Sequence, residues 1–224
     1  MQGGKVLHMS SRVGDQLAKL PTADKTPRTA RGARTLRKIL DAALHEFGER
    51  GFSEASISGI TKRAEVALGT FYTYFDSKDS VFRALVGAMS ERVREHVAPA
   101  LEGIDNALDG EQRALEFFLQ FVASNRQVYR IIDEAEFVDP DGFRSHYETT
   151  ASRIAGRLDR AREQGDIDRS IGDADTEILA WALMGANVFL GLRFAVWKSE
   201  DPARVAKVVG QMVRQGLAPG RDDS

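Results

Sequence analysis

Apolar residues along most of this chain recur three or four positions apart, which is the period of an α-helix with one buried face. The first pattern starts at Arg34, where Ile39, Ala43 and Phe47 share one face until Gly51 ends the helix. The sequence has no run of alternating β-branched residues bounded by turn residues. These patterns predict an all-α fold.

Two short helices and one longer helix are predicted after Gly51. Ser56 is the expected N-cap of the first, and the second runs from about residue 68 to residue 75. Asp76 or Ser77 then caps the longer helix. Its apolar positions are Val81, Phe82, Leu85 and Met89.

The rest of the chain predicts helix after helix. Two helices cover residues 111–124 and about 128–135. Asp139 and Asp201 are each followed by proline, which favours the first position of a helix, so helices are expected to begin there. A further helix opens at Asp173, so the last two predicted helices cover residues 173–197 and 202–216.

One part of the helix at 173–197 is apolar on every side. From Ile178 to Leu192 no residue is charged, although the segment contains Asn187. It is shorter than the roughly 20 residues of a membrane span, and we expect no membrane association. A helix that is apolar all round must be covered all round. We expect its own domain on one side and a second subunit on the other.

Charge divides the chain into two parts. Residues 1–83 hold 14 Lys and Arg against 9 Asp and Glu, a net +5, whereas residues 84–224 hold 17 against 24, a net −7. We expect only the basic part to meet a polyanion. The predicted domains are a flexible basic arm (1–30), a helix-turn-helix DNA-binding domain (31–80), a helical ligand-binding and dimerisation domain (81–217) and a tail (218–224).

The compartment expected from composition is the cytoplasm. The chain has no cysteine, so it has neither a disulfide framework nor a thiolate metal site. The first thirty residues lack an apolar core followed by a cleavage site, so no secretory signal is expected, and Met9 is an alternative start.

The spacing over residues 51–79 is typical of a helix-turn-helix, whose second helix enters the DNA major groove. The exposed face of that helix is expected to present small or hydrogen-bonding groups to base edges, namely Leu68, Gly69, Thr70, Tyr72 and Thr73. Tyr72, Tyr74 and Lys78 are the expected phosphate donors. Arg34 and its basic neighbours start the first helix, where a solvated helix end and a DNA-contacting arm are both open interpretations.

The same region resembles the TetR family of bacterial repressors. The resemblance lies in the string ILDAALHEFGERGF, the serine-isoleucine start of the second helix, Gly69 to Tyr72, then Tyr74-Phe75 and Ser77-Lys78. It implies a homodimer that binds double-stranded DNA and carries a C-terminal ligand pocket. It also implies base contacts from Ser56, Ser58, Leu68, Gly69, Thr70 and Tyr72, and phosphate contacts from Tyr72, Thr73, Tyr74 and Lys78.

Two positions depart from the family pattern. Glu65 stands where the turn commonly has glycine, and Ala67 stands where a serine commonly caps the recognition helix. If residue 65 has a positive φ, glutamate costs about 1 kcal/mol there. Its carboxylate would also repel phosphate.

The C-terminal helices are expected to hold the effector and the second subunit. We predict a small, largely apolar effector, an acyl chain or an aromatic acid, that releases the protein from DNA. The predicted pocket residues are Phe118, Phe121, Arg126, Tyr147, Trp181 and Asn187. The predicted dimer interface includes Gly185, Phe189, Val208 and Met212.

Two other functions are weaker interpretations. The first is a DNA-binding architectural protein without a ligand. The second is an enzyme with a carboxylate and histidine metal site, drawn from His146 and the carboxylates Asp133, Glu134, Glu136, Asp139 and Asp141. Acidic helix ends explain these carboxylates better, and the sequence has no phosphate-binding glycine loop. We expect no enzyme activity, no cofactor and no metal.

Overall fold

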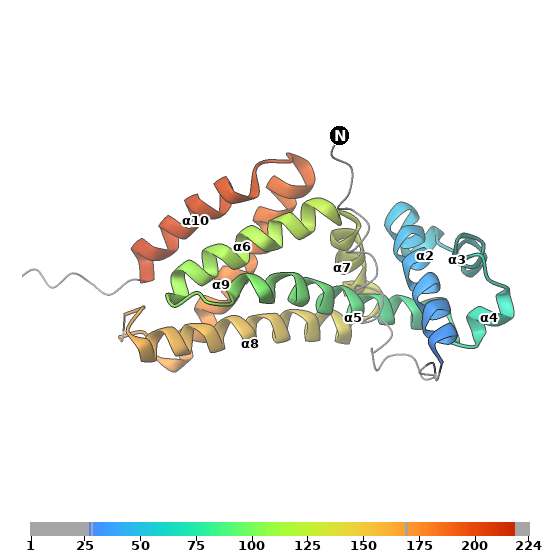
Figure 1. The fold of residues 1–224 in the computed structure, drawn as a ribbon, viewed down its shortest axis with the longest axis horizontal. Helices are drawn as coiled ribbons and strands as arrows, with labels where there is room; N and C mark the ends of the chain where they lie inside the picture. Colours follow the sequence, from blue (N-terminus) through green and yellow to red (C-terminus); the bar gives the residue numbers. More distant parts are fainter. Residues whose placement is uncertain (1–26, 28, 169, 218–224) are drawn as a thin grey trace, which may run out of the picture. The chain divides into compact units, whose positions relative to one another are not determined.

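The computed structural model describes residues 27, 29–168 and 170–217, and within them every regular element is a helix (Figure 1). The α-helices are α2 (Ala30–Glu54), α3 (Ile57–Ala64), α4 (Leu68–Tyr72), α5 (Lys78–Val97), α6 (Ala107–Ser124), α7 (Gln127–Val138), α8 (Pro140–Gln164), α9 (Asp173–Leu190) and α10 (Pro202–Leu217). A 3₁₀ helix, η1 (Ala98–Leu101), follows α5, and a π-helix, η2 (Gly191–Trp197), follows α9. The all-α prediction is confirmed. Almost all of the predicted arm and the tail lie outside the described residues.

Three of the predicted caps form with side-chain hydrogen bonds. The Ser56 hydroxyl accepts from the Gly59 amide at 3.0 Å at the start of α3. Ser77 caps α5, because its hydroxyl accepts from the Ser80 amide at 3.0 Å. At the start of α10 the Asp201 carboxylate accepts from the Ala203 amide at 3.2 Å. Each cap satisfies an amide that the helix itself leaves unpaired.

Several helix ends depart from the prediction: α2 begins at Ala30 and α6 at Ala107, each four residues early, and three other differences concern breaks and ends. Gly51 breaks α2 with φ 78° and ψ 169°, as expected, but helical turns resume and continue to Glu54. The recognition helix ends at Tyr72, three residues before the buried Phe75. The predicted helix 173–197 is α9 followed by the wider turns of η2.

Contacts within the chain divide it into two compact units. Unit 1 takes residues 1–92 and 127–144, and unit 2 takes 93–126 and 145–224. The first part of α5 belongs to unit 1 because Phe82 stacks edge-on against Phe47 and Phe52, with ring centroids 5.1 Å apart in both pairs. Helix α7 belongs there because it packs against α2.

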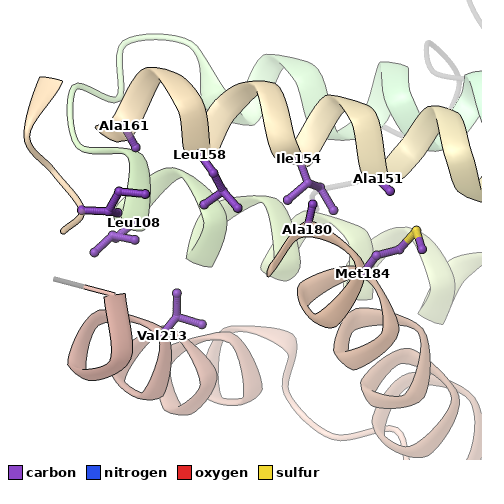
Figure 2. Packing of buried hydrophobic residues seen from close by; sticks show 9 residues of the cluster. Leu108, Ala151, Ile154, Leu158, Ala161, Ala180, Met184 and Val213 are labelled. Carbon is purple, nitrogen blue, oxygen red and sulfur yellow. The ribbon is translucent and has the colours of Figure 1, made fainter. Parts of the chain in front are cut away.

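Unit 2 has its own apolar core (Figure 2). Helix α8 contributes one face, which carries Ala151, Ile154, Leu158 and Ala161. Ala180 and Met184 of α9, Leu108 of α6, Val213 of α10 and Ile167 complete the cluster. Helix α10 packs along α6. A buried ion pair joins α6 to α8, with the Arg157 Nη2 atom 3.0 Å from the Glu111 carboxylate.

The segment Ala174–Trp197 is long and apolar enough, by length and composition alone, to cross a membrane. Its mean hydropathy is 1.6. A core helix passes the same test, and Ala180, Met184, Gly191 and Ala195 of this segment are buried in the protein. The opposite side of α9 is apolar but exposed. The sequence analysis expected a second subunit to cover this side.

Candidate functional site

The turn between α3 and α4 adopts the strained conformation that the sequence suggested. Glu65 caps α3 in the left-handed region, with φ 55° and ψ 44°. The Val66 amide donates to the Thr61 carbonyl at 3.1 Å, which closes the helix end. Ala67, the N-cap of α4, makes no side-chain cap bond. Residue 65 therefore has the positive φ on which the expected cost of glutamate depends, and α4 begins without a side-chain cap.

Helix α4 presents one buried and one exposed face. Phe71 is fully buried and tethers the helix to the core of unit 1, whereas Leu68 and Tyr72 expose 52% and 45% of their surface. A Cβ added to Gly69 would meet no atom within 4 Å, so another backbone can approach it closely. Thr73 is exposed as well, and Thr70 is half-buried. This outward face suits contact with the edges of bases.

Three further predicted contact residues are at the surface. Ser56 and Ser58 are exposed at the start of α3, with their hydroxyl oxygens 3.1 Å apart. Arg34 is exposed in the first turns of α2. Other exposed cations of unit 1 are Arg31, Lys38, Arg50, Lys62, Arg63, Arg83, Arg130 and Arg144. Lys and Arg side chains are the groups that bind phosphate.

Tyr74 does not face outward as predicted. Its hydroxyl donates to the Gly32 carbonyl at 3.2 Å, and the side chain is half-buried. A Cβ on Gly32 would lie 3.4 Å from the same hydroxyl. Because this bond uses the only phenolic proton, the predicted donation to phosphate is not supported by the geometry. Tyr74 instead ties the start of α2 to the end of the recognition helix.

Lys78 also departs from its predicted role as a phosphate donor. Its Nζ atom donates to the carbonyls of Phe52, Ser53 and Ala55 at 2.7, 3.2 and 3.0 Å. The ammonium group also lies 4.5 Å from the centre of the Phe52 ring. An ammonium has three donors, so all of them are used here. Lys78 caps the carbonyl end of α2, and the sequence offered no signal for this role.

A second set of contacts at the same helix end comes from α7 and was missed by the sequence analysis. Glu134 accepts from the Phe52 amide at 2.7 Å, and Arg130 donates to the carbonyls of Gly48 and Glu49 at 3.3 and 3.0 Å. A Cβ on Gly51 would lie 2.5 Å from the Glu134 carboxylate. The glycine is thus required by φ and by the approach of α7.

Two carboxyl groups in unit 1, those of Asp41 and Asp133, have a raised pKa. Burial raises the pKa of Asp41, against the opposing effects of Arg92, Arg37 and His45. Burial also raises the pKa of Asp133 in α7, with the neighbouring charges of Glu136 and Glu134 acting in the same direction. Among residues 27, 29–168 and 170–217, no three His, Asp or Glu side chains are grouped to bind a metal.

The predicted effector residues occupy different environments in unit 2. Phe121 is buried with 6% exposure, and Phe118 and Asn187 are half-buried. Tyr147 packs against the apolar core of unit 2. Arg126 is exposed and donates to the Ser199 hydroxyl at 2.6 Å. Trp181 is 42% exposed, so the structure places it at the surface and not in an enclosed site with Phe121.

Trp181 shares the exposed side of α9 with the predicted dimer residues. Ile178 and Phe189 expose 67% and 72% of their surface, and open space surrounds Gly185. On α10, Val208 and Met212 lie one turn apart, and each is 61% exposed. We name Ile178, Trp181, Phe189, Val208 and Met212 the apolar surface of unit 2. Exposed apolar residues in such number are typical of a protein interface.

Comparison with known proteins agrees with this arrangement. Residues 39–85 match the model of the bacterial regulatory proteins of the tetR family. The chain is 28% identical over 173 residues to the HTH-type transcriptional repressor Rv1474c of Mycobacterium tuberculosis, covering 77% of this chain and 88% of that protein. A TetR-like regulator from Rhodococcus sp. RHA1 superimposes with a TM-score of 0.66 at 29% identity, over 84% of this chain and 98% of that one.

A more distant structure shares the fold. AibR, solved with isovaleryl coenzyme A and operator DNA, superimposes with a TM-score of 0.64 at 16% identity, over 80% of this chain and 97% of that one. The matched segment 39–85 includes most of α2, all of α3 and α4, and the buried start of α5. Residues 39–85 are therefore a DNA-binding domain of the tetR family, and the chain that carries it resembles TetR-like transcriptional regulators over most of its length.

Proposed function

We propose that the protein is a homodimeric repressor that binds a near-palindromic operator and leaves it when a small, largely apolar metabolite binds. The observation that carries the DNA-binding part is the outward face of α4, where Gly69 is open and Tyr72 is exposed, on a helix anchored by Phe71. Rigid anchoring matters because base contacts discriminate only when the side chains are held in register.

The apolar surface of unit 2 supports a second copy of the chain as the partner. Its residues come from α9 and α10, which is where the family resemblance implies dimerisation. A two-fold axis makes each patch contact its own counterpart. Two recognition helices then read half-sites about 34–36 Å apart, which accounts for a palindromic operator.

Aromatic residues in unit 2 and the ligands of a relative support an acyl effector. AibR was solved with isovaleryl coenzyme A, an acyl thioester, and with operator DNA. In this chain Phe117, Phe118 and Phe121 lie within five residues of each other on α6, and Phe121 is buried. Binding sites for small molecules are mostly apolar with a few polar groups. For release, the effector must bind the DNA-incompetent state more tightly than the other.

The relatives are regulators rather than enzymes, and DNA-binding regulators of this family are in general soluble and cytoplasmic. We place this protein in the cytoplasm for the same reason, with no catalytic role. The architectural alternative differs in one measurable way, because a protein without an effector has no ligand that both stabilises it and changes its affinity for DNA.

The test uses fluorescence anisotropy with a labelled inverted repeat taken from DNA that flanks the gene. We expect Tyr72→Ala to weaken binding at least tenfold, and Thr70→Ala to change the preferred half-site sequence. Gln215→Ala, at an exposed position of α10, is the control. Unchanged operator affinity in both α4 variants would refute the docking surface. A metabolite screen in which stabilising ligands never alter operator affinity would refute the effector-controlled function.

A further inference from the structure

The imidazole of His96 has a buried nitrogen without a hydrogen-bond partner. His96 is in the last turn of α5, within unit 2. Its Nε2 atom has no contact with solvent and no partner among the described residues, although the residue as a whole is half-buried. Buried polar atoms in folded proteins almost always have a partner. The Nε2 atom is therefore a position at which a water molecule or a ligand can complete a hydrogen bond.

Two phenylalanine rings of α6 surround this imidazole. The His96 ring centre lies 5.8 Å from that of Phe117 and 5.6 Å from that of Phe121, with interplanar angles of 45° and 51°. Neither ring carries a conventional acceptor or donor for Nε2. The three rings therefore form a largely apolar cluster in which Nε2 is the buried and unpaired polar atom, a composition expected of a site for an apolar molecule with one polar group.

The charge state of His96 and its neighbours determines which polar group of a ligand fits beside Nε2. Burial lowers the pKa of His96, so the ring is neutral near pH 7 and has one N–H donor and one acceptor nitrogen. The guanidinium carbon of Arg113 lies 4.9 Å from the Phe117 ring centre, but its Nη1 atom is already 3.3 Å from the Glu116 carboxylate. A carboxylate beside these rings would share Arg113 with Glu116, and burying a charge that is incompletely paired is costly. A neutral carbonyl oxygen meets no such penalty.

We propose that His96 Nε2 donates a hydrogen bond to the carbonyl oxygen of the effector, whose acyl chain packs against Phe117 and Phe121. This inference rests on the effector-controlled function proposed above and names its ligand class, a neutral acyl ester or thioester in preference to the free acid. The site includes Phe121 from the sequence-predicted pocket and adds His96 and Phe117. It excludes the exposed Trp181.

The experiment compares isovaleryl-CoA and decanoyl-CoA with isovalerate and decanoate, on the full-length protein. Protein labelled with ¹⁵N-histidine reports the His96 Nε2 resonance, while Tm and operator anisotropy report binding and release. We expect a thioester to shift that resonance, raise Tm and lower operator affinity, and the free acids to do so at least tenfold more weakly.

Two variants separate this role from a merely structural one. His96→Phe removes the unpaired nitrogen but keeps an aromatic ring, so we expect the ligand-free protein to gain Tm while thioester affinity falls about tenfold. His96→Gln retains an amide donor and should recover part of that affinity. Ser152→Ala, at an exposed position of α8, should match the parent.

The outcomes distinguish the two proposals. If a thioester releases the operator but leaves the Nε2 resonance unchanged, or if His96→Phe binds it as tightly as the parent, the His96 site is wrong and effector control stands. Preference for the free acids would also overturn the neutral-carbonyl assignment. If none of the four probes raises Tm or alters operator affinity, the acyl effector and this site both fail.

Discussion

Unit 1 and unit 2 differ in what their side chains do at the ends and surfaces of their helices. In unit 1 polar side chains close the helix ends: Lys78, Arg130 and Glu134 bond to the carbonyl end of α2, and Tyr74 bonds near its start. Unit 2 leaves five large apolar side chains outward on α9 and α10, and one buried imidazole nitrogen unpaired. The helix ends beside the recognition helix are thus bonded within the chain, whereas unit 2 has an apolar surface that, in our proposal, a second copy covers.

This contrast explains how a regulator of this kind is controlled. A recognition helix must hold its geometry, so unit 1 has bonds that lock α2, α4 and α5 together. An effector must shift an equilibrium, and it can do so only through contacts that one state makes better than another. In our proposal, His96 of unit 2 provides such a contact. Four predictions test this difference between unit 1 and unit 2.

The largest expected effect follows from substituting the apolar surface. Phe189→Arg puts a charge on a side chain that is 72% exposed in the single chain and, in our proposal, covered in the dimer. We expect a monomer whose operator affinity is lower by about 10²-fold or more, because the linked second half-site is lost. Sedimentation velocity and anisotropy measure the two changes.

The control for this substitution is Ser152→Arg, which adds the same charge to the exposed face of α8. It should remain dimeric with the parent affinity. A dimeric Phe189→Arg protein with full activity would place the subunit interface elsewhere.

A second prediction concerns acid sensitivity of unit 2. Burial, with a smaller contribution from Arg153, lowers the pKa of His146 from 6.5 to about 4. Between these two values the unfolded chain binds the proton and the folded chain does not, so folding stability falls as pH decreases through this window. The loss from this residue reaches up to about 3 kcal/mol near pH 4.

Urea unfolding followed by tryptophan fluorescence measures the effect, because Trp181 and Trp197 are both in unit 2. His146→Gln cannot take up the proton and should lose less stability between pH 7 and 4.5 than the parent. Equal losses in the two proteins would show that His146 is accessible to protons in the folded state.

The third prediction separates two roles for Lys78. Lys78→Met keeps the aliphatic stem but removes three hydrogen bonds to the end of α2, so we expect unit 1 to lose about 2 kcal/mol of stability. The slope of log affinity against log salt should stay unchanged, since no phosphate contact is lost.

Lys62→Met, at an exposed position of α3, is the matched control and should leave Tm unchanged. A Lys78→Met protein with the parent Tm and a shallower salt slope would restore the phosphate role that the sequence suggested. Either result identifies what the ammonium group contacts when DNA is bound.

The local features of the fold could be predicted from the sequence. The caps Ser56 and Asp201 and the left-handed Glu65 depend on residues a few positions apart, which a sequence displays directly. The uncharged stretch of α9 likewise indicated a helix that needs two covers. These are features in which local chemistry determines the outcome.

Contacts between distant residues could not be predicted. Phe52 and Glu134 are 82 positions apart, and nothing near either residue indicates the bond between them. Lys78 matched a family pattern, but a pattern of residue types does not show where an ammonium group points. The same holds for His96, whose significance depends on Phe117 and Phe121 beside it.

The smallest expected effect concerns the turn between α3 and α4 in unit 1, where Glu65 has a positive φ. Glu65 has φ 55° at the end of α3, a conformation that glycine adopts without steric cost. We expect Glu65→Gly to stabilise unit 1 by about 1 kcal/mol, the usual cost of a left-handed residue with a side chain. Glu65→Asn should gain part of this, because asparagine tolerates the same region.

Glu65→Ala separates the backbone effect from the charge. Alanine keeps the unfavourable φ and removes the carboxylate, so it should leave Tm near the parent value but tighten operator binding at low salt, where repulsion between Glu65 and phosphate is least screened. Glu65→Gly should raise Tm and also tighten operator binding. Thermal unfolding and anisotropy at two salt concentrations measure them. If Glu65→Gly lowers both Tm and affinity, the carboxylate makes a contact that outweighs the strain, and the turn is stabilised by its side chain.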